Sequence, residues 1–329
     1  MLVAFSTFLI ALPLPFLLRP VLTYLGAVDV PSARSSHTSS VLRGAGVAQA
    51  LSMLLVLGVV AATTEQDRTV YVSLLIAMAC TTGLGALEDL VGVPIMVRGV
   101  MTLAIGLAAT SVVVRVTGES DWWICIGGVA VVGLVNVVNF MDGVNGISAL
   151  HGVIAGLSLA YVGADQEQWL VVVGLALAGA YAAFLPWNIN GRMFLGDAGS
   201  YLLGGTVAMC IVLGWIRGLP IEALAGSMVI YVADTGVTLA SRIVAGQKWY
   251  ESHREHTYQR LNRIGLAHIQ VTAIVGAASS VCAVAGIVAA YAHGPTRTLA
   301  FAVLVGVVGV YTLARTRIVL PDAADGTPS

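Results

Sequence analysis

The chain has 329 residues, of which 58% are hydrophobic and 10% charged, with a formal net charge of −1 and a mean hydropathy of +0.90. A soluble domain carries about 25% charged residues, so this composition excludes an ordinary soluble enzyme and predicts an all-α polytopic integral membrane protein in a lipid bilayer. The basic residues form no stripe suited to nucleic acid, so no nucleic-acid partner is expected.

The first apolar stretch, Leu2–Leu18, has no basic residue before it, and Arg19 follows it. A secretory signal peptide carries positive charge in front of its apolar region, so this stretch is predicted to be a retained helix with its N-terminus outside. A spanning helix needs about 20 apolar residues, and about 11 candidate spans are found. The others are Ala45–Ala62, Val70–Leu87, Val97–Val116, Trp122–Asn139, Ile147–Gly163, Trp169–Phe184, Tyr201–Trp215, Leu219–Leu239, Ile269–Tyr291 and Leu299–Ala314.

Basic residues distribute unequally between the two sets of loops that this map defines. Basic residues favour the cytoplasmic side of a membrane protein, so the richer set predicts a periplasmic N-terminus and a cytoplasmic C-terminus. All the polar clusters described below fall on the predicted cytoplasmic side. We expect a single transmembrane domain over 1–320 and a disordered polar tail over 321–329. The poorer set holds only Arg68, Arg115, Arg217 and Arg297.

Two polar segments precede the middle of the chain. The segment RSSHTSSVLRGAG is interpreted as a polar re-entrant loop in which Arg43 is available to phosphate, or alternatively as a basic interfacial anchor. The segment LEDL places Glu88 and Asp89 side by side at the end of the third span. Adjacent carboxylates could share a metal or take a proton, although a solvated helix end is the alternative. Arg98, nine residues after Asp89, could hold a phosphate oxygen.

The segment NVVNFMDGVNGI gives a stronger signal. Asn136, Asn139 and Asp142 recur at a spacing of three, which places them on one face of a helix. Gly143 and Gly146 then release the backbone into a loop. Amides that recognise a nucleobase or sugar, with a carboxylate facing a metal, fit this pattern, and a polar contact between helices is the alternative.

The segment FLGDAGS places Asp197 between glycines where a helix begins. Backbone N–H groups at a helix start can bind phosphate, and the aspartate offers a hard oxygen ligand for Mg²⁺. An ordinary helix N-cap is the alternative interpretation. Asn188 and Arg192, just upstream, add an amide and a guanidinium to the segment.

The segment HREHTYQRLNR carries His253, Arg254 and His256. The two histidines would share a face if the segment were helical, and with the arginines they form a cationic patch suited to a pyrophosphate or a lipid phosphate. A zinc site is the rival interpretation, but zinc normally needs a third protein ligand, and a solvated basic loop is a further alternative. Asp234, near the end of the ninth span, is either a functional acid or a structural hydrogen-bonding group.

Together these segments, from about Val28 to Ala267, resemble the polyprenyl-phosphate N-acetylhexosamine-1-phosphate transferase superfamily, of glycosyltransferase family 4 type. The RSSH…RGAG and HREHTYQRL segments look closest to the bacterial branch that initiates O-antigen-type glycans. The resemblance implies transfer of a sugar-1-phosphate from a UDP-N-acetylhexosamine to undecaprenyl phosphate, with release of UMP. It also implies Mg²⁺ or Mn²⁺ as cofactor, a multi-pass location in the bacterial inner membrane with a cytoplasmic active site, and a homodimer.

The resemblance also suggests roles for residues that match the family's motifs. Asp197 looks like the metal ligand, and Asp89 matches an acid close to the lipid phosphate. Asn139 and Asp142 match the segment that meets the nucleotide and the pyrophosphate. The residues expected to act in catalysis are Asp89, Glu88, Asp142, His253 and His256, and those expected to bind substrate are Asn136, Asn139, Asn188, Arg192, Arg98, Arg43 and Arg254.

Two positions depart from the family pattern. Glu88 replaces the first aspartate of an Asp-Asp pair, and Ala45 interrupts a glycine-rich loop. These departures keep a catalytically silent membrane scaffold as one alternative. A transporter or flippase for a lipid-linked or anionic solute is the other, but transporters tend to carry internal repeats, and none is found here.

Overall fold

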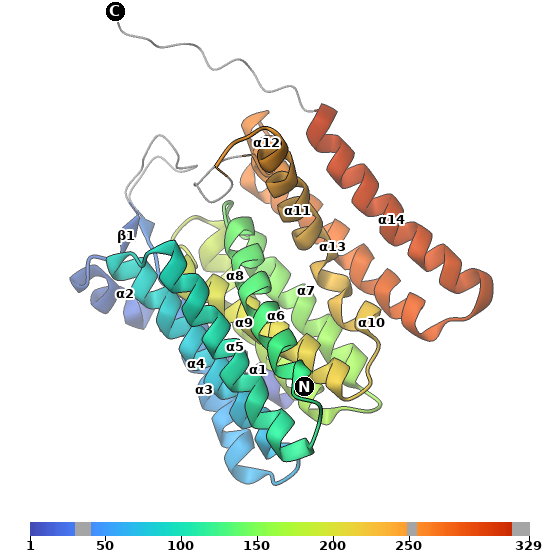
Figure 1. The fold of residues 1–329 in the computed structure, drawn as a ribbon. Helices are drawn as coiled ribbons and strands as arrows, with labels where there is room; N and C mark the ends of the chain where they lie inside the picture. The colour runs from blue at the N-terminus through green and yellow to red at the C-terminus, as the bar shows by residue number, and fades with distance from the viewer. Residues whose placement is uncertain (30–40, 249–254, 318–329) are drawn as a thin grey trace, which may run out of the picture.

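The computed structural model describes residues 1–29, 41–248 and 255–317 as a bundle of α-helices (Figure 1). Within these residues, ten helical segments are long and apolar enough to cross a membrane, and the shorter apolar helix α7 (Ile147–Gly163) is an eleventh candidate. All the predicted spans are therefore helical, which confirms the all-α polytopic fold. The predicted tail at 321–329 lies outside the described residues.

The first predicted span is divided into two helices, α1 (Leu2–Ala11) and α2 (Leu14–Tyr24). Pro13 lies at the junction and is the N-cap of α2; a proline there ends the preceding hydrogen-bond ladder because it has no N–H group. Four longer helices follow in the chain: α3 (Gly46–Thr63), α4 (Arg68–Val91), α5 (Ile95–Thr117) and α6 (Trp122–Met141).

The second half of the chain begins with α7 and α8 (Gln168–Ile189), which are followed by α9 (Gly196–Ile216). The next span is interrupted, because a 3₁₀ turn, η1 (Gly226–Met228), separates the short helix α10 (Ile221–Ala225) from α11 (Val229–Val244). The chain then forms the short helix α12 (Thr257–Arg263) and the two long helices α13 (His268–Tyr291) and α14 (Gly294–Arg317).

A short antiparallel pair of strands lies between α2 and α3. Strand β1 (Val28–Asp29) pairs with β2 (Val41–Leu42), and Leu42 also forms a parallel bridge with Met193. Strand β1, α2 and α12 lie at one end of the bundle, whereas the N-terminus lies at the opposite end (Figure 1). The bridge therefore joins the start of α3 to the segment that leads into α9.

Helix α9 is the most enclosed span of the bundle, with 89% of its apolar window buried. Glycines allow its neighbours to approach closely. A Cβ atom on Gly204 would lie 2.6 Å from the carbonyl oxygen of Leu134 in α6, and one on Gly85 in α4 would collide with the carbonyl oxygen of Asp197. Small residues permit such close contact between spanning helices, so the positions of α4, α6 and the first turn of α9 are fixed against one another.

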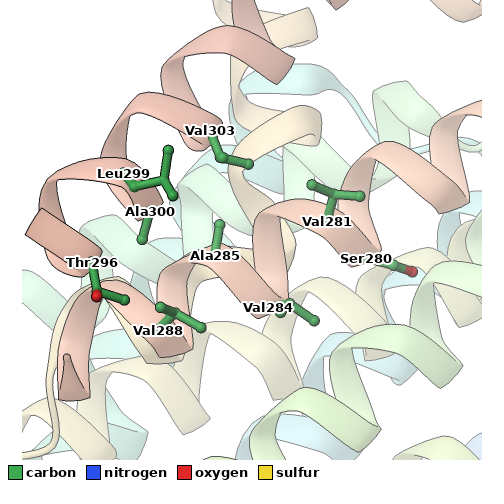
Figure 2. A pocket seen from close by; sticks show the side chains of 9 residues that line it. All are labelled: Ser280, Val281, Val284, Ala285, Val288, Thr296, Leu299, Ala300 and Val303. Atoms are coloured by element: carbon green, nitrogen blue, oxygen red, sulfur yellow. The ribbon is translucent and has the colours of Figure 1, made fainter.

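Helix α14 is the least enclosed span, with 11% of its window buried, and it leans away from the bundle beside α13 (Figure 1). The two helices form a groove of about 420 Å³ (Figure 2). None of the described residues that line this groove is ionisable, so it offers apolar surface rather than a catalytic site. Its lining residues are Ser280, Val281, Val284, Ala285, Val288, Thr296, Leu299, Ala300 and Val303.

Candidate active site

Asp89, in the last turn of α4, binds the N-terminus of α9. The backbone N–H of Asp197 donates to Oδ1 of Asp89 at 3.0 Å, and the N–H of Ala198 donates to Oδ2 at 3.0 Å. The side chain of Asp89 is only 3% exposed. The expectation that these helix-start N–H groups bind phosphate is therefore wrong for these two groups, because a carboxylate of the protein already accepts both hydrogen bonds.

The segment Leu42–Gly46 runs along the segment that leads into α9. The N–H of Phe194 donates to the carbonyl of Leu42 at 2.8 Å, and the N–H of Gly46 donates to the carbonyl of Leu195 at 2.9 Å. Gly46 has no space for a Cβ atom because the backbone of Gly199 lies against it. These contacts bring the RGAG and FLGDAG motifs together, although 150 residues of sequence separate them.

The alanine in the RGAG motif does not disturb its backbone. Ala45 lies in the right-handed helical region, with φ −61° and ψ −14°, which an alanine adopts without steric strain. Gly44, in contrast, has a φ of +83°, and this left-handed conformation favours glycine. The conformational demand in this motif therefore falls on Gly44 rather than on Ala45.

Arg43 and Arg98 supply the positive charge of the site. Arg43 donates from its guanidinium to the backbone carbonyl of Asp89, and its Nε lies 3.8 Å from the Asp89 carboxylate. Nη1 of Arg98 lies 2.9 Å from Oε1 of Glu88 and 3.7 Å from Oδ2 of Asp197. Arg98 thus lies between two carboxylates of the protein, and its role in holding a phosphate oxygen stays a prediction.

Both carboxylate oxygens of Glu88 are engaged in contacts. One carboxylate oxygen pairs with Arg98, and the other accepts a hydrogen bond from the backbone N–H of Val93, in the turn after α4. Arg98 also donates to the hydroxyl of Tyr201 at 3.4 Å. The glutamate therefore ties the start of α5 to the end of α4 and places Arg98 beside Asp197.

The amide of Asn139 joins α6 to the first turn of α9. Its Nδ2 donates to Oδ1 of Asp197 at 2.9 Å and lies 3.2 Å from Oγ of Ser200. Asn136, one turn earlier, donates instead to the carbonyl of Val132 in its own helix at 2.7 Å. Both asparagines lie in α6, as the spacing predicted, whereas Asp142 lies just beyond the end of the helix. Within the described residues, Asn139 contacts another motif and Asn136 bonds within its own helix.

Helix α6 ends at Met141, and Asp142 is its C-cap. Burial raises the pKa of the Asp142 carboxyl to about 7, and the negative charge of Asp89 shifts it in the same direction. A cation bound near these two acids would stabilise the ionised form of Asp142.

Asn188 connects two loops of the site. Its Oδ1 accepts a hydrogen bond of 2.7 Å from the N–H of Gly146, and its Nδ2 donates to the carbonyl of Met193 at 3.1 Å. The residue is 4% exposed. Its observed contacts are therefore with backbone groups, whereas Arg192, four residues later, is exposed.

His256 lies at the start of α12 and is 2% exposed. The helix begins at Thr257, with His256 as its extended N-cap, so the helical condition under which the two histidines would share a face is not met at His256. Its Nδ1 lies 3.4 Å from Oδ1 of Asp234, and the hydroxyl of Tyr311 donates to Oδ2 of Asp234 at 2.8 Å. Asp234 therefore anchors α12 and α14 to α11. His253 and Arg254 lie outside the described residues.

Tyr258 is a site residue that sequence analysis did not identify. Its hydroxyl donates to the carbonyl of Phe140 at 2.9 Å, and a Cβ atom on Gly143 would collide with that hydroxyl. The tyrosine thus packs directly on the loop that carries Asp142. A tyrosine in a basic segment has no spacing relationship to a distant glycine, so no sequence pattern pointed to this contact.

The described residues contain no group of three or more histidine, cysteine or acidic side chains that could hold a metal ion by themselves. Asp197 is nevertheless suited to share a metal with a ligand. Its side chain is 25% exposed and its carboxylate contacts Asn139 and Arg98. Mg²⁺ usually binds through one or two carboxylates together with substrate phosphates, and these residues fit that arrangement rather than an all-protein cage.

Within the described residues, the fold and the site define a multi-pass membrane protein with carboxylates, arginines and amides gathered at one end of its helices. Residues 71–215, which include most of these groups, match Glycosyl transferase family 4.

Similarity to curated proteins extends over most of the chain. The chain is 27% identical to decaprenyl-phosphate N-acetylglucosaminephosphotransferase of Mycobacterium tuberculosis, over 80% of this chain and 78% of the relative. It is 25% identical to undecaprenyl-phosphate alpha-N-acetylglucosaminyl 1-phosphate transferase of Escherichia coli, over 88% and 83%. A probable undecaprenyl-phosphate N-acetylglucosaminyl 1-phosphate transferase of Bacillus subtilis is 24% identical, over 86% and 82%. The family match and these relatives support the resemblance to the polyprenyl-phosphate N-acetylhexosamine-1-phosphate transferase superfamily.

Proposed function

We propose that the protein transfers a sugar-1-phosphate from a UDP-N-acetylhexosamine to undecaprenyl phosphate and releases UMP. One observation carries this proposal: Asn139 and Arg98, from two different helices, both contact the partly exposed carboxylate of Asp197 in a third helix. The named relatives act on polyprenyl phosphates and N-acetylglucosamine phosphate, which supports the same class of acceptor and donor here.

The reaction brings two anionic groups together. A phosphate oxygen of the lipid attacks the sugar-bearing phosphorus of the donor, a new P–O bond forms, and the bond to the bridging oxygen breaks so that UMP leaves. The acceptor phosphate is largely ionised at neutral pH, so positioning and charge neutralisation contribute more than proton removal. Arg98 and Arg43 supply fixed positive charge beside the carboxylates.

Asp197 is proposed to hold Mg²⁺ or Mn²⁺ together with donor phosphate oxygens. Such an ion, when bound, would neutralise charge on the transferring phosphoryl group. Asn139 would then orient the Asp197 carboxylate through its 2.9 Å hydrogen bond. Asp142, in the loop after α6, is proposed to face the donor in the same charged environment.

Sidedness and assembly are also part of the proposal. The excess of basic residues on one set of loops supports a cytoplasmic active site and a periplasmic N-terminus in the bacterial inner membrane. The branch that initiates O-antigen-type glycans and a homodimeric assembly stay predictions from the resemblance. The named relatives are all transferases, so they lend no support to the transporter alternative.

A transfer assay tests the proposed function. Purified full-length protein in nanodiscs would be mixed with undecaprenyl phosphate, Mg²⁺ and a panel of UDP-N-acetylhexosamines, and both UMP and the lipid-linked sugar would be measured. We expect UMP and lipid product in equal amounts with at least one donor, and no UMP when the acceptor is omitted. Folded protein that releases no UMP with any donor would refute the transferase assignment.

A further inference from the structure

The position of Asp89 at the N-terminus of α9 indicates the role of this residue. Its two carboxylate oxygens accept hydrogen bonds from two successive N–H groups of α9, each at 3.0 Å. A helix N-terminus carries partial positive charge and unsatisfied N–H groups, so a carboxylate in this position stabilises the first turn of the helix. The first of the two N–H groups belongs to Asp197 itself.

Two glycines and Arg43 surround Asp89 where it contacts the N-terminus of α9. A Cβ atom on Gly196 would lie 2.5 Å from Oδ2 of Asp89, and one on Gly44 would lie 3.6 Å from the same oxygen. Both glycines have a positive φ, +72° and +83°, and Arg43 donates to the backbone carbonyl of Asp89. The carboxylate is therefore enclosed by backbone on two sides, and its side chain is only 3% exposed.

Asp197 is more exposed than Asp89, and a side chain must be exposed to contact a ligand. Its side chain is 25% exposed, compared with 3% for Asp89. The orientation of that side chain depends on the first turn of α9, because Asp197 is the second residue of the helix. Asn139 holds the carboxylate from one direction, and Asp89 holds the backbone of the same residue from another.

We propose that Asp89 is a positioning residue, which caps the N-terminus of α9 and thereby fixes Asp197, rather than a base that touches the substrate. The inference rests on the proposed function where it names Asp197 as a metal ligand, but the cap itself can be tested without turnover. It assigns the two acids of the site separate tasks.

Hydrogen–deuterium exchange of metal-free protein tests the cap directly. In Asp89→Asn, the side-chain NH₂ faces one of the two N–H donors, so one hydrogen bond is lost. We expect exchange of the amides of Asp197 and Ala198 to accelerate about tenfold or more, as the loss of one charge-assisted hydrogen bond predicts. The matched control is Asp67→Asn at the opposite end of the bundle, where Asp67 pairs with Arg217 and Asn tolerates the positive φ of 56°.

Kinetics separate positioning from base catalysis. For a positioning residue, Asp89→Asn raises the KM for Mg²⁺ while kcat at saturating Mg²⁺ stays within about tenfold of wild type. Loss of a general base would instead lower kcat by about 10²–10⁴-fold at any metal concentration. Unchanged exchange at Asp197 and Ala198, or a kcat loss of that size with an unchanged KM for Mg²⁺, would overturn the proposal.

Two further outcomes keep the inference separate from the proposed function. If Asp89→Asn does not fold, Asp89→Glu takes its place, because it keeps the negative charge but the longer side chain moves the carboxylate away from the two N–H groups. The same changes in exchange and KM are expected, and their absence counts against the cap. If wild-type protein transfers no sugar phosphate but Asp89→Asn accelerates exchange, the cap stands and only the transferase assignment fails.

Discussion

The side-chain amide of Asn139 donates a 2.9 Å hydrogen bond to Oδ1 of Asp197, across 58 residues of sequence. This contact joins the end of α6 to the beginning of α9, so the two motifs most prominent in the sequence form one site. It also leaves Oδ2 of Asp197 facing Arg98. The predictions below follow from this geometry.

Replacement of Asp197 tests the proposed metal ligand. Asp197→Asn keeps the shape of the side chain but removes the charge that would hold Mg²⁺. We expect transfer to fall at least about 10²-fold, as for loss of one dominant electrostatic contact, with expression and Tm in detergent close to wild type. Turnover near the wild-type rate would exclude Asp197 as the ligand.

The two asparagines of α6 provide a matched comparison. Asn139→Ala removes the hydrogen bond to Asp197, whereas Asn136→Ala removes only a bond to Val132 within the same helix. We expect the larger loss of kcat for Asn139→Ala, by about tenfold or more for one charge-assisted hydrogen bond, when UMP release is measured. Equal losses in the two variants would contradict a special role for the Asn139 contact.

Asn188 is expected to support the site through stability. Asn188→Ala leaves the N–H of Gly146 and the carbonyl of Met193 without their buried partner, at a cost of about 1–3 kcal/mol for each unsatisfied group. Thermal unfolding should show a clearly lowered Tm. The control is Asn190→Ala, since Asn190 is exposed and its side chain donates to the carbonyl of Pro186 in the same helix, and its Tm should change little.

Tyr258→Phe tests the contact between α12 and the Asp142 loop. The change removes the hydrogen bond to the Phe140 carbonyl and should lower stability by about 0.5–1.5 kcal/mol, with a reduced rate of transfer because the loop is less firmly held. Tyr161→Phe is the control, because Tyr161 is 67% exposed. Equal effects on Tm and rate in both variants would show that the Phe140 contact is unimportant.

Asp142 should make stability depend on pH. Its pKa is raised from 3.8 to about 7 by burial, so the folded protein binds this proton more tightly than the unfolded chain. The resulting stabilisation is complete below about pH 4 and is lost as pH rises through 7. In EDTA, the Tm of wild type should therefore fall more between pH 5 and pH 8 than the Tm of Asp142→Asn. Parallel curves would rule out this residue as the source.

Apolar length alone predicted the spans, because a membrane core requires long apolar helices whatever their contacts. The spacing of Asn136, Asn139 and Asp142 predicted one shared helical face, since local periodicity determines which residues share a face; the two asparagines are helical, but Asp142 lies just past the end of α6. The cap formed by Asp89 and the contact of Tyr258 with Gly143 could not be predicted in this way. Both depend on segments that meet across more than 100 residues, and no local pattern encodes such pairings.

The backbone conformation of the RGAG motif could also not be predicted from the sequence. Ala45 interrupts the glycine-rich loop of the family pattern, but it adopts an ordinary helical conformation. The restrictive position is Gly44, with its φ of +83°. Which glycine in a motif is indispensable depends on dihedral angles that the sequence does not specify.

The contact between Gly46 and Gly199 has a consequence for motion during turnover. Since backbone meets backbone with no side chain between them, no rotamer change can absorb a displacement of α3 relative to α9, and the two helices are expected to move as one rigid body. Substrate-dependent rearrangement must then arise outside this pair, for example in α12, whose hydrogen bonds run to Asp234 and to the carbonyl of Phe140 rather than to α3 or α9. Distance measurements between spin labels on α3, α9 and α12 would reveal such a division directly.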